Sequence, residues 1–159
     1  MPIAATYVHT NLIARDWRSL AAFYEAVFGC IPIPPARDLR GDWLDAATGV
    51  AGAHISGLHL RLPGFGADGP TLELMQYEPA LERTAPGLNR PGFGHIAFAV
   101  EDVAQTRRAV LAAGGSAVGR IVSWTIAGAR SAEWTYLRDP EGNVIELQRR
   151  AANQGADPV

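Results

Sequence analysis

One arrangement of residues occurs twice in this chain of 159 residues, and it limits the folds that the chain can adopt. In each half, a histidine is followed after seven residues by an aspartate and after twenty residues by a glycine. The two sets are His9, Asp16 and Gly29, and His95, Asp102 and Gly115. Each half then contains an acid between two aliphatic residues, Glu73 in the first and Glu146 in the second. Two related modules would place two imidazoles and two carboxylates at equivalent positions, which is the outline of a metal site.

Each module is predicted to begin with a strand and a helix. Residues 7–14 and 94–100 are strand-like, because they carry β-branched and aromatic side chains. Asp16 is typical of a helix N-cap, and Asp102 with Gln105 resembles a capping box. Apolar residues then recur at helical spacing, and glycines end both helices.

Strands joined by turns follow the helix in both modules. We predict them at residues 57–62 and 71–77, and at residues 117–123, 132–138 and 143–149. The sequence Asp-Pro-Glu-Gly at 139–142 favours a tight hairpin, whereas the equivalent hairpin has a longer tip at 63–70. That tip lacks the lysine and the following helix of a phosphate-binding loop. Each module therefore has the order βαβββ.

Residues 34–52 have no counterpart in the second module, and we interpret them as an inserted loop or a short helix. Trp43 and Leu44 lie there at near-helical spacing. We expect Trp43 to cover the mouth of the site and to select the substrate, as inserted loops often do. The alternative is that the segment pads the sheet or a dimer interface.

The chain is predicted to form one domain of two modules. The first module spans residues 1–78, a linker with two Pro-Gly steps spans 79–91, the second module spans 92–150, and a flexible tail spans 151–159. The length and the 48% hydrophobic content suffice for one globular body.

Composition excludes several classes of function. Lys and Arg number 14 against 16 Asp and Glu, without a basic stripe, so a nucleic-acid surface is not expected. Cys30 has no partner for an intrachain disulfide, and the N-terminal sequence lacks the pattern of a signal peptide. No apolar run approaches the roughly 20 residues of a membrane-spanning helix. We expect a soluble, cytoplasmic protein that binds a small-molecule substrate and forms a homodimer.

The motifs of both modules resemble the vicinal oxygen chelate superfamily, which includes glyoxalase I, methylmalonyl-CoA epimerase, fosfomycin-resistance proteins and extradiol dioxygenases. The resemblance covers residues 7–149, and its most specific parts are GFGHIAF at 92–98 and RDPEGNVIEL at 138–147. It implies an α+β fold in which two βαβββ modules pair into a cupped sheet. It also implies one divalent metal ion held by His9, Glu73, His95 and Glu146.

The chemistry of this ligand set agrees with catalysis. Two imidazoles and two carboxylates suit Ni, Co, Mn, Fe or Zn, and four ligands leave two of six octahedral positions open. The expected function is a metal-dependent isomerase or lyase of the glyoxalase and epimerase type, which acts on a small carbonyl compound through a metal-bound enediolate. Glu146 and Glu73 are the candidate catalytic residues. The alternative is a ligand-binding or drug-binding protein of the resistance type, without turnover.

Four residues are candidates for binding the substrate: His54, Tyr77, Trp43 and Glu133. His54 and His59 are separated by an odd interval on one strand, so they should lie on opposite faces of the sheet. Glu133 and Tyr136 lie on the matching strand, where one could act as a base or donor, or form a plain cross-strand pair. Trp124 and Trp134 could line an apolar pocket, pack in the core or form an interface.

Glutathione is not an expected part of the substrate. The resemblance to bacterial glyoxalase I implies an Arg four residues after the first His and an Asn four residues after the first Glu. Ile13 and Tyr77 stand at these positions. The substitution speaks against glutathione, although not against isomerase chemistry.

Overall fold

The computed structural model describes residues 3–84, 87–126 and 130–150. Contacts along the chain define two compact units, residues 1–83 and 84–159. The boundary between them lies within residues 79–91, the segment predicted as a linker. The tail predicted at 151–159 lies outside the described residues.

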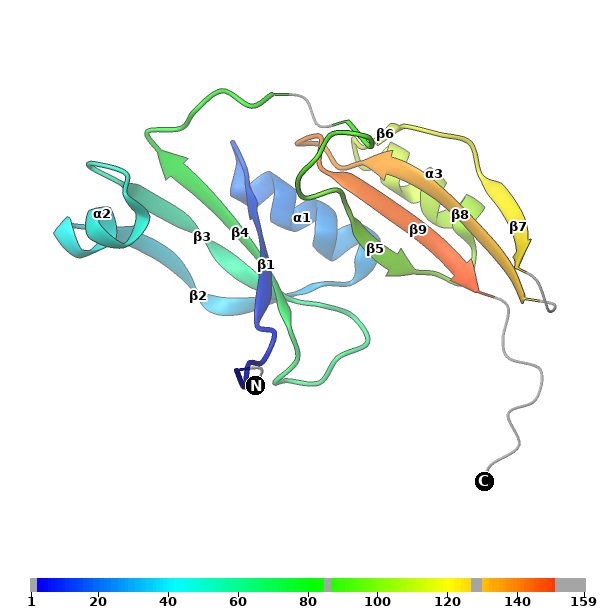
Figure 1. Cartoon of the computed structure of the whole chain (residues 1–159), viewed down its shortest axis with the longest axis horizontal. Helices are drawn as coiled ribbons and strands as arrows, with labels where there is room; N and C mark the ends of the chain where they lie inside the picture. Colours follow the sequence, from blue (N-terminus) through cyan, green and yellow to red (C-terminus); the bar gives the residue numbers. More distant parts are fainter. Residues whose placement is uncertain (1–2, 85–86, 127–129, 151–159) are drawn as a thin grey trace. The chain divides into compact units, whose positions relative to one another are not determined.

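Unit one contains a four-stranded sheet in the order β1-β4-β3-β2 (Figure 1). Its strands are β1 (His9–Ile13), β2 (Ile31–Arg40), β3 (His54–Arg61) and β4 (Thr71–Glu78). Strand β1 is parallel to β4, and the other neighbours are antiparallel. Helix α1 (Trp17–Phe28) connects β1 to β2, and helix α2 (Asp42–Thr48) connects β2 to β3.

Helix α1 begins and ends where the sequence predicts. The side chain of Asp16 accepts hydrogen bonds from the backbone N–H groups of Arg18 and Ser19, at 3.1 and 3.2 Å. Gly29 ends the helix with φ 67°, a left-handed conformation that glycine adopts without steric cost. Leu20 and Tyr24 are buried on the face of α1 that contacts β3 and β4. Burial of this apolar face against the sheet forms the core of unit one.

The prediction for residues 34–52 is partly wrong. Residues 34–40 belong to strand β2, which pairs with β3 on both sides of an irregularity between Ile33 and Arg37. The strand was missed because it lies at the sheet edge, where prolines are tolerated and most side chains are exposed. The short helix is confirmed as α2.

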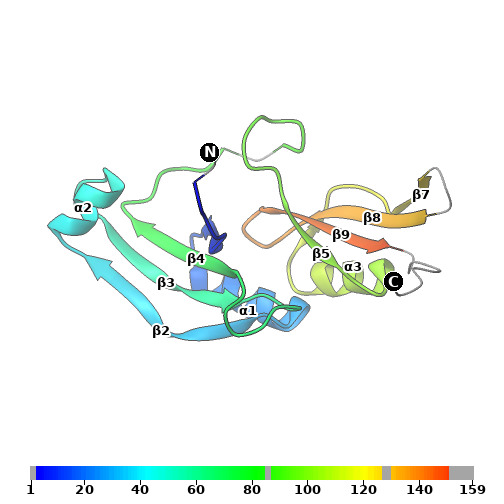
Figure 2. The same cartoon turned by 60° about the horizontal axis from the view of Figure 1, so that its bottom comes forward.

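Helix α2 packs on the face of the sheet opposite to α1, near one end of β3 and β4 (Figure 2). Its Leu44 forms a buried cluster with Ala53, Ile55 and Met75, and Tyr77 packs against this cluster. The side chain of Ser56, next to Ile55, instead accepts a hydrogen bond from Trp17 of α1 at 3.2 Å. Neighbouring residues of β3 thus face different helices, as the alternation of a strand requires.

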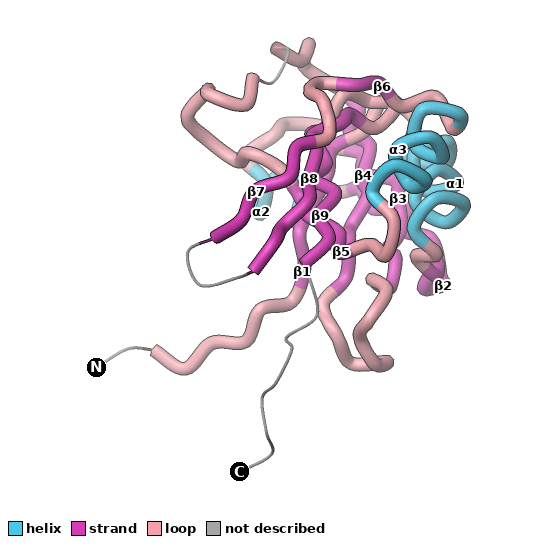
Figure 3. The backbone as a smooth tube through the Cα atoms, turned by 90° about the vertical axis from the view of Figure 1, so that its right-hand side faces the viewer, coloured by secondary structure: helices cyan, strands magenta, loops and turns pink. Residues whose placement is uncertain are grey.

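Unit two repeats this plan. Its elements are β5 (Ile96–Ala99), α3 (Val103–Ala112), β6 (Ser116–Ala117), β7 (Val122–Ile126), β8 (Arg130–Arg138) and β9 (Val144–Arg150). The sheet order is β5-β9-β8-β6, with β7 also paired to β8. Strand β5 is parallel to β9. Helix α3 contacts β8 and β9 from one face of the sheet (Figure 3).

Most predictions for unit two are confirmed. Asp102 caps α3 by accepting a hydrogen bond from the backbone N–H of Gln105 at 2.7 Å. A tight turn at 139–142 joins β8 to β9, with the backbone N–H of Gly142 bonded to the carbonyl of Asp139. The single strand predicted at 117–123 is wrong, because this region forms two strands, β6 and β7. Together they occupy the place of β2, so both units follow the order βαβββ, with helix α2 added in unit one.

Among the described residues, no helix is long and apolar enough to cross a membrane.

Candidate functional site

The two predicted His–Glu pairs have the same relation to their sheets. Glu73 on β4 lies opposite Asn11 of β1, two residues after His9. Glu146 on β9 lies opposite Ala97 of β5, two residues after His95. Because strand residues two apart share a face, His9 lies on the same face as Glu73. In unit one this is the face opposite to α1. His95 immediately precedes β5 and contacts Glu146.

Each pair is in direct contact. The Nε2 atom of His9 lies 3.4 Å from Oε2 of Glu73, and Nε2 of His95 lies 2.9 Å from Oε2 of Glu146. Two atoms that each lie about 2.1 Å from one metal ion, at a right angle, are about 3 Å apart. Both pairs therefore fit neighbouring positions of a divalent ion. The glutamate side chains are each 18% exposed, so solvent reaches them.

One unit supplies a pair of candidate ligands rather than a complete site. Across residues 3–84, 87–126 and 130–150, no group of three or more His, Cys, Asp or Glu side chains is arranged to hold a metal ion. Convergence of the four predicted ligands on one ion thus stays a prediction.

Two more side chains of unit one contact Glu73. The Nδ2 group of Asn11 donates a hydrogen bond to Oε2 at 2.6 Å, and Nε2 of His59 lies 3.0 Å from Oε1. His59 is directly opposite Glu73 across β3 and β4. Burial lowers the pKa of His59, the charge of Glu73 raises it, and electrostatic interactions with His9 and Arg37 lower it further. The ring is therefore neutral near pH 7.

Tyr136 of β8 has the matching place in unit two, directly opposite Glu146. Its ring meets the ring of His95 edge-on, with centroids 5.3 Å apart. Burial, then the charge of Glu146 and a hydrogen bond to it, raise the pKa of Tyr136. The phenol thus keeps its proton at neutral pH and donates a hydrogen bond to the carboxylate of Glu146.

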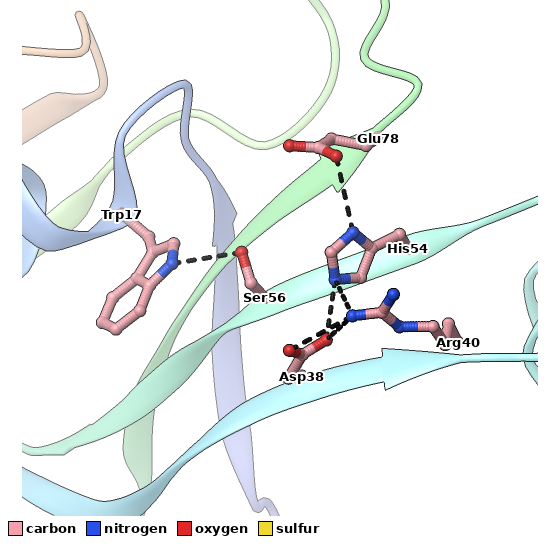
Figure 4. A network of polar contacts seen from close by, with 6 residues as sticks. All are labelled: Trp17, Asp38, Arg40, His54, Ser56 and Glu78. Atoms are coloured by element: carbon pink, nitrogen blue, oxygen red, sulfur yellow. Dashed lines mark hydrogen bonds and ion pairs between the residues drawn. The ribbon is translucent and has the colours of Figure 1, made fainter.

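His54 lies on the other face of β3 from His59, as the odd interval predicts. Its Nε2 atom is 2.7 Å from Oδ1 of Asp38, and its Nδ1 atom is 3.4 Å from Oε2 of Glu78 (Figure 4). Arg40 also contacts Asp38, at 3.0 Å. The hydrogen bonds from His54 and then Arg40 lower the pKa of Asp38. The structure therefore does not bring His54 together with Glu73.

Glu133 is also separated from the predicted ligands. It lies opposite Arg149 on β8 and β9, and its Oε2 atom is 3.3 Å from Nε of Arg149. Because Tyr136 and Glu133 are three residues apart on one strand, Glu133 faces away from Glu146. The structure agrees with the plain cross-strand pair.

Tyr77 and Ile13 lie on the same face as Glu73, because they are separated from Glu73 and His9 by even intervals on β4 and β1. Ile13 is 49% exposed, and Tyr77 packs against the cluster around Leu44. Trp43 on α2 is 60% exposed. In unit two, Trp124 and Trp134 meet edge-on with centroids 6.5 Å apart.

The contacts of Glu73 with Asn11 and with His59 were not predicted. The sequence could have predicted the contact with Asn11, because Asn11 is two residues after His9 and so lies on the same face of the strand. Thr71 was missed as well, and its hydroxyl lies 2.9 Å from Nδ1 of His59. The hairpin of β3 and β4 was predicted, but its register, which brings His59 to Glu73 and Thr71, cannot be read from the spacing of residues.

The sequence matches a family model over residues 6–147, from the strand that carries His9 to the end of the motif that carries Glu146. The chain belongs to the Glyoxalase/Bleomycin resistance protein/Dioxygenase superfamily. This confirms the resemblance to the vicinal oxygen chelate proteins and the glyoxalase-like βαβββ fold. The superfamily includes metal-dependent enzymes and resistance proteins. No curated protein matches the chain significantly.

Solved structures share the fold at low sequence identity. A glyoxalase family protein from Bacillus cereus aligns with a TM-score of 0.74 and 18% identity, covering 96% of this chain and 97% of the other. The fosfomycin resistance protein FosX from Listeria monocytogenes aligns with a TM-score of 0.54 and 17% identity, covering 98% and 97%. A FosX variant in complex with Mn(II) and a dihydroxypropylphosphonic acid aligns with a TM-score of 0.53 and 16% identity, covering 91% and 92%.

Proposed function

We propose that this protein is a divalent-metal-dependent isomerase or lyase of the glyoxalase and epimerase type, acting on a small carbonyl compound. The observation that carries the proposal is the repeated His–Glu contact, at 3.4 Å in unit one and 2.9 Å in unit two, in the same register. Stability alone does not explain a repeated contact of this kind, because an exposed His–Glu pair adds little to the stability of the fold. Binding of one metal ion by all four residues would explain it.

His9, Glu73, His95 and Glu146 would hold the ion. A bound divalent ion would act as a Lewis acid, stabilising negative charge that develops on the oxygens of a carbonyl compound as a proton leaves the neighbouring carbon. The carboxylates of Glu73 and Glu146 are the proton acceptors closest to that chemistry. Tyr136 donates a hydrogen bond to Glu146 and so orients it.

The substrate is proposed to be a small molecule that does not contain glutathione. On the face that carries Glu73, Ile13 is exposed and apolar, and Tyr77 packs against the cluster around Leu44, where a peptide-like thiol would need polar partners. We therefore expect little or no turnover of the hemithioacetal of methylglyoxal and glutathione. A kcat/KM above roughly 10⁴ M⁻¹s⁻¹ would contradict this restriction.

Elemental analysis of protein purified without a metal-affinity tag tests the site. We expect about one divalent ion per chain, and a sharp loss of metal in His95→Ala and Glu146→Ala while the fold persists. His54→Ala and Glu133→Ala are matched controls, because they remove the same residue types from the opposite faces of the two sheets. Both controls should keep their metal.

The outcomes separate two classes of protein. Loss of metal in the ligand variants, with retention in the controls, supports the enzyme. Stoichiometric metal retained in both ligand variants would overturn the ligand assignment. A wild-type protein that is indifferent to metal yet binds small apolar ligands would instead be a ligand-binding protein of the resistance type.

A further inference from the structure

The carboxylate of Glu73 is engaged at both of its oxygens by residues outside the proposed ligand set. Asn11 donates to Oε2 at 2.6 Å, and His59 contacts Oε1 at 3.0 Å. Asn11 lies on β1 and His59 on β3, and these strands are the two neighbours of β4. The carboxylate is thus held from both sides, which leaves it little freedom to rotate.

Hydrogen bonds orient the ring of His59. An ionised carboxylate only accepts hydrogen bonds, so Nε2 of His59 carries the proton that faces Glu73. Nδ1 lies 2.9 Å from the hydroxyl of Thr71, which can donate or accept and so holds the other side of the ring. Both ring nitrogens are used in these contacts, so His59 links the carboxylate of Glu73 to the hydroxyl of Thr71.

We propose that Asn11 and His59 are positioning residues that hold the Glu73 carboxylate in the orientation in which it binds the metal ion, with Thr71 fixing the ring of His59. This inference rests on the proposed function. Partners that orient a ligand strengthen metal binding, because the ligand loses less freedom when the ion arrives, and removing one typically weakens binding about 10- to 100-fold.

Unit two gives an internal contrast. Ala97 stands at the register position of Asn11 and carries no hydrogen-bonding side chain, whereas Tyr136 stands at the position of His59. Besides His9, Glu73 therefore has two polar contacts, with Asn11 and His59. Glu146 has no counterpart of the Asn11 contact, because Ala97 stands at that position.

The test is titration of the metal-free protein with Co(II), followed by its visible absorption spectrum and by the dissociation constant. Asn11→Ala and His59→Ala should each weaken Co(II) binding about 10-fold or more and change the spectrum. His59→Gln keeps an N–H donor and should recover much of the affinity. Thr71→Val removes only the hydroxyl and should have a smaller effect. His54→Ala is the control and should bind as the wild type does.

Asn11 is exposed, so Asn11→Ala should fold, and the melting temperature of the metal-free variants monitors this. Folded Asn11→Ala and His59→Ala variants with wild-type Co(II) affinity and spectrum would overturn the positioning role while leaving the proposed function intact. A wild-type protein that binds no Co(II) or other divalent ion would overturn both. Equal weakening by His59→Gln and His59→Ala would contradict the role of the N–H donor.

Discussion

The two units carry the same His–Glu pair, but the surroundings of the two pairs differ. In unit one, Asn11 and His59 contact Glu73, and helix α2 packs on the same face of the sheet. In unit two, Ala97 and Tyr136 take the places of Asn11 and His59, and only residues 127–129 separate β7 from β8, the strands that correspond to β2 and β3. The comparison teaches that the repeat fixes the positions of the proposed ligands, whereas the neighbours of each ligand are particular to its unit.

The largest expected difference in stability concerns the residue two positions before His59 and Tyr136. Unit one has Gly57 there, and unit two has Trp134. A Cβ atom on Gly57 would lie 2.0 Å from the carbonyl oxygen of Leu74 and 2.5 Å from the sulfur of Met75. Since the backbone carbonyl cannot move without disturbing the pairing of β3 with β4, Gly57→Ala should lower the free energy of unfolding by about 3 kcal/mol.

Urea unfolding of Gly57→Ala measures this loss. Gly66→Ala is the control, because a Cβ atom there would meet nothing within 4 Å. The control should change stability by less than about 0.5 kcal/mol. A Gly57→Ala variant as stable as the control would show that β3 can tolerate a side chain at this position, as β8 does.

The second difference is between the turns of the two hairpins. Asp139 in the tight turn of unit two is 2% exposed, and its Oδ1 atom accepts hydrogen bonds from the backbone N–H groups of Glu141 and Asn143, at 3.0 and 2.8 Å. Asp139→Ala would leave these groups without that acceptor and should cost about 2 kcal/mol. Thermal or urea unfolding checks the value.

Asp68 provides the comparison, because it is exposed in the longer tip of unit one. Asp68→Ala should be within about 0.5 kcal/mol of the wild type. Equal losses in the two variants would mean that the aspartates matter through net charge and not through the turn.

These examples also show how much of the fold could be predicted from the sequence. The caps of α1 and α3 and the turn after β8 were predictable, because aspartate and glycine act there through contacts that are local in the chain. Gly29 and Gly115 are both twenty residues after a histidine, but they do not have the same structural role. Gly29 adopts a left-handed conformation, but Gly114 takes that role in unit two. A Cβ atom on Gly115 would instead lie 2.6 Å from the carbonyl oxygen of Arg138.

The candidate site was predictable in its strands and less so in its contacts. Alternation placed His54 and His59 on opposite faces, but it could not decide which of them meets Glu73. That depends on the register of β3 against β4, which tertiary packing sets. Glu133 was grouped with Tyr136 although an odd interval separates them, and the structure pairs Glu133 with Arg149 on the other face.

A third test concerns α2, which lies between β2 and β3 of unit one. Trp43 is 60% exposed on this helix, whose Leu44 is anchored to the face that carries Glu73. If Trp43 contacts the substrate, Trp43→Ala should change KM or kcat several-fold, by a factor of about 3 to 10, with metal content and melting temperature nearly unchanged. Steady-state kinetics and thermal unfolding of one preparation measure both. If Trp43→Ala keeps full activity but loses stability or its oligomeric state, the role of α2 is structural and not substrate binding.

The smallest expected effect concerns the polar contacts of His54, on the face of unit one away from Glu73. Asp38 is exposed, and its pKa is lowered first by the hydrogen bond from His54 and then by Arg40. A lowered pKa in the folded state stabilises the fold at pH values above the ordinary pKa of 3.8, and this contribution is lost as the pH falls through the lowered value. Solvent screens an exposed pair, so Asp38→Asn should lower the melting temperature at pH 7 by no more than about 2 °C. The difference from the wild type should shrink below pH 4 and disappear in strong acid, as melting curves across this range would show.

The metal content of Asp38→Asn should not change, because Asp38 and Glu73 lie on opposite faces of the sheet. A loss of metal in this variant would mean that the two faces are coupled.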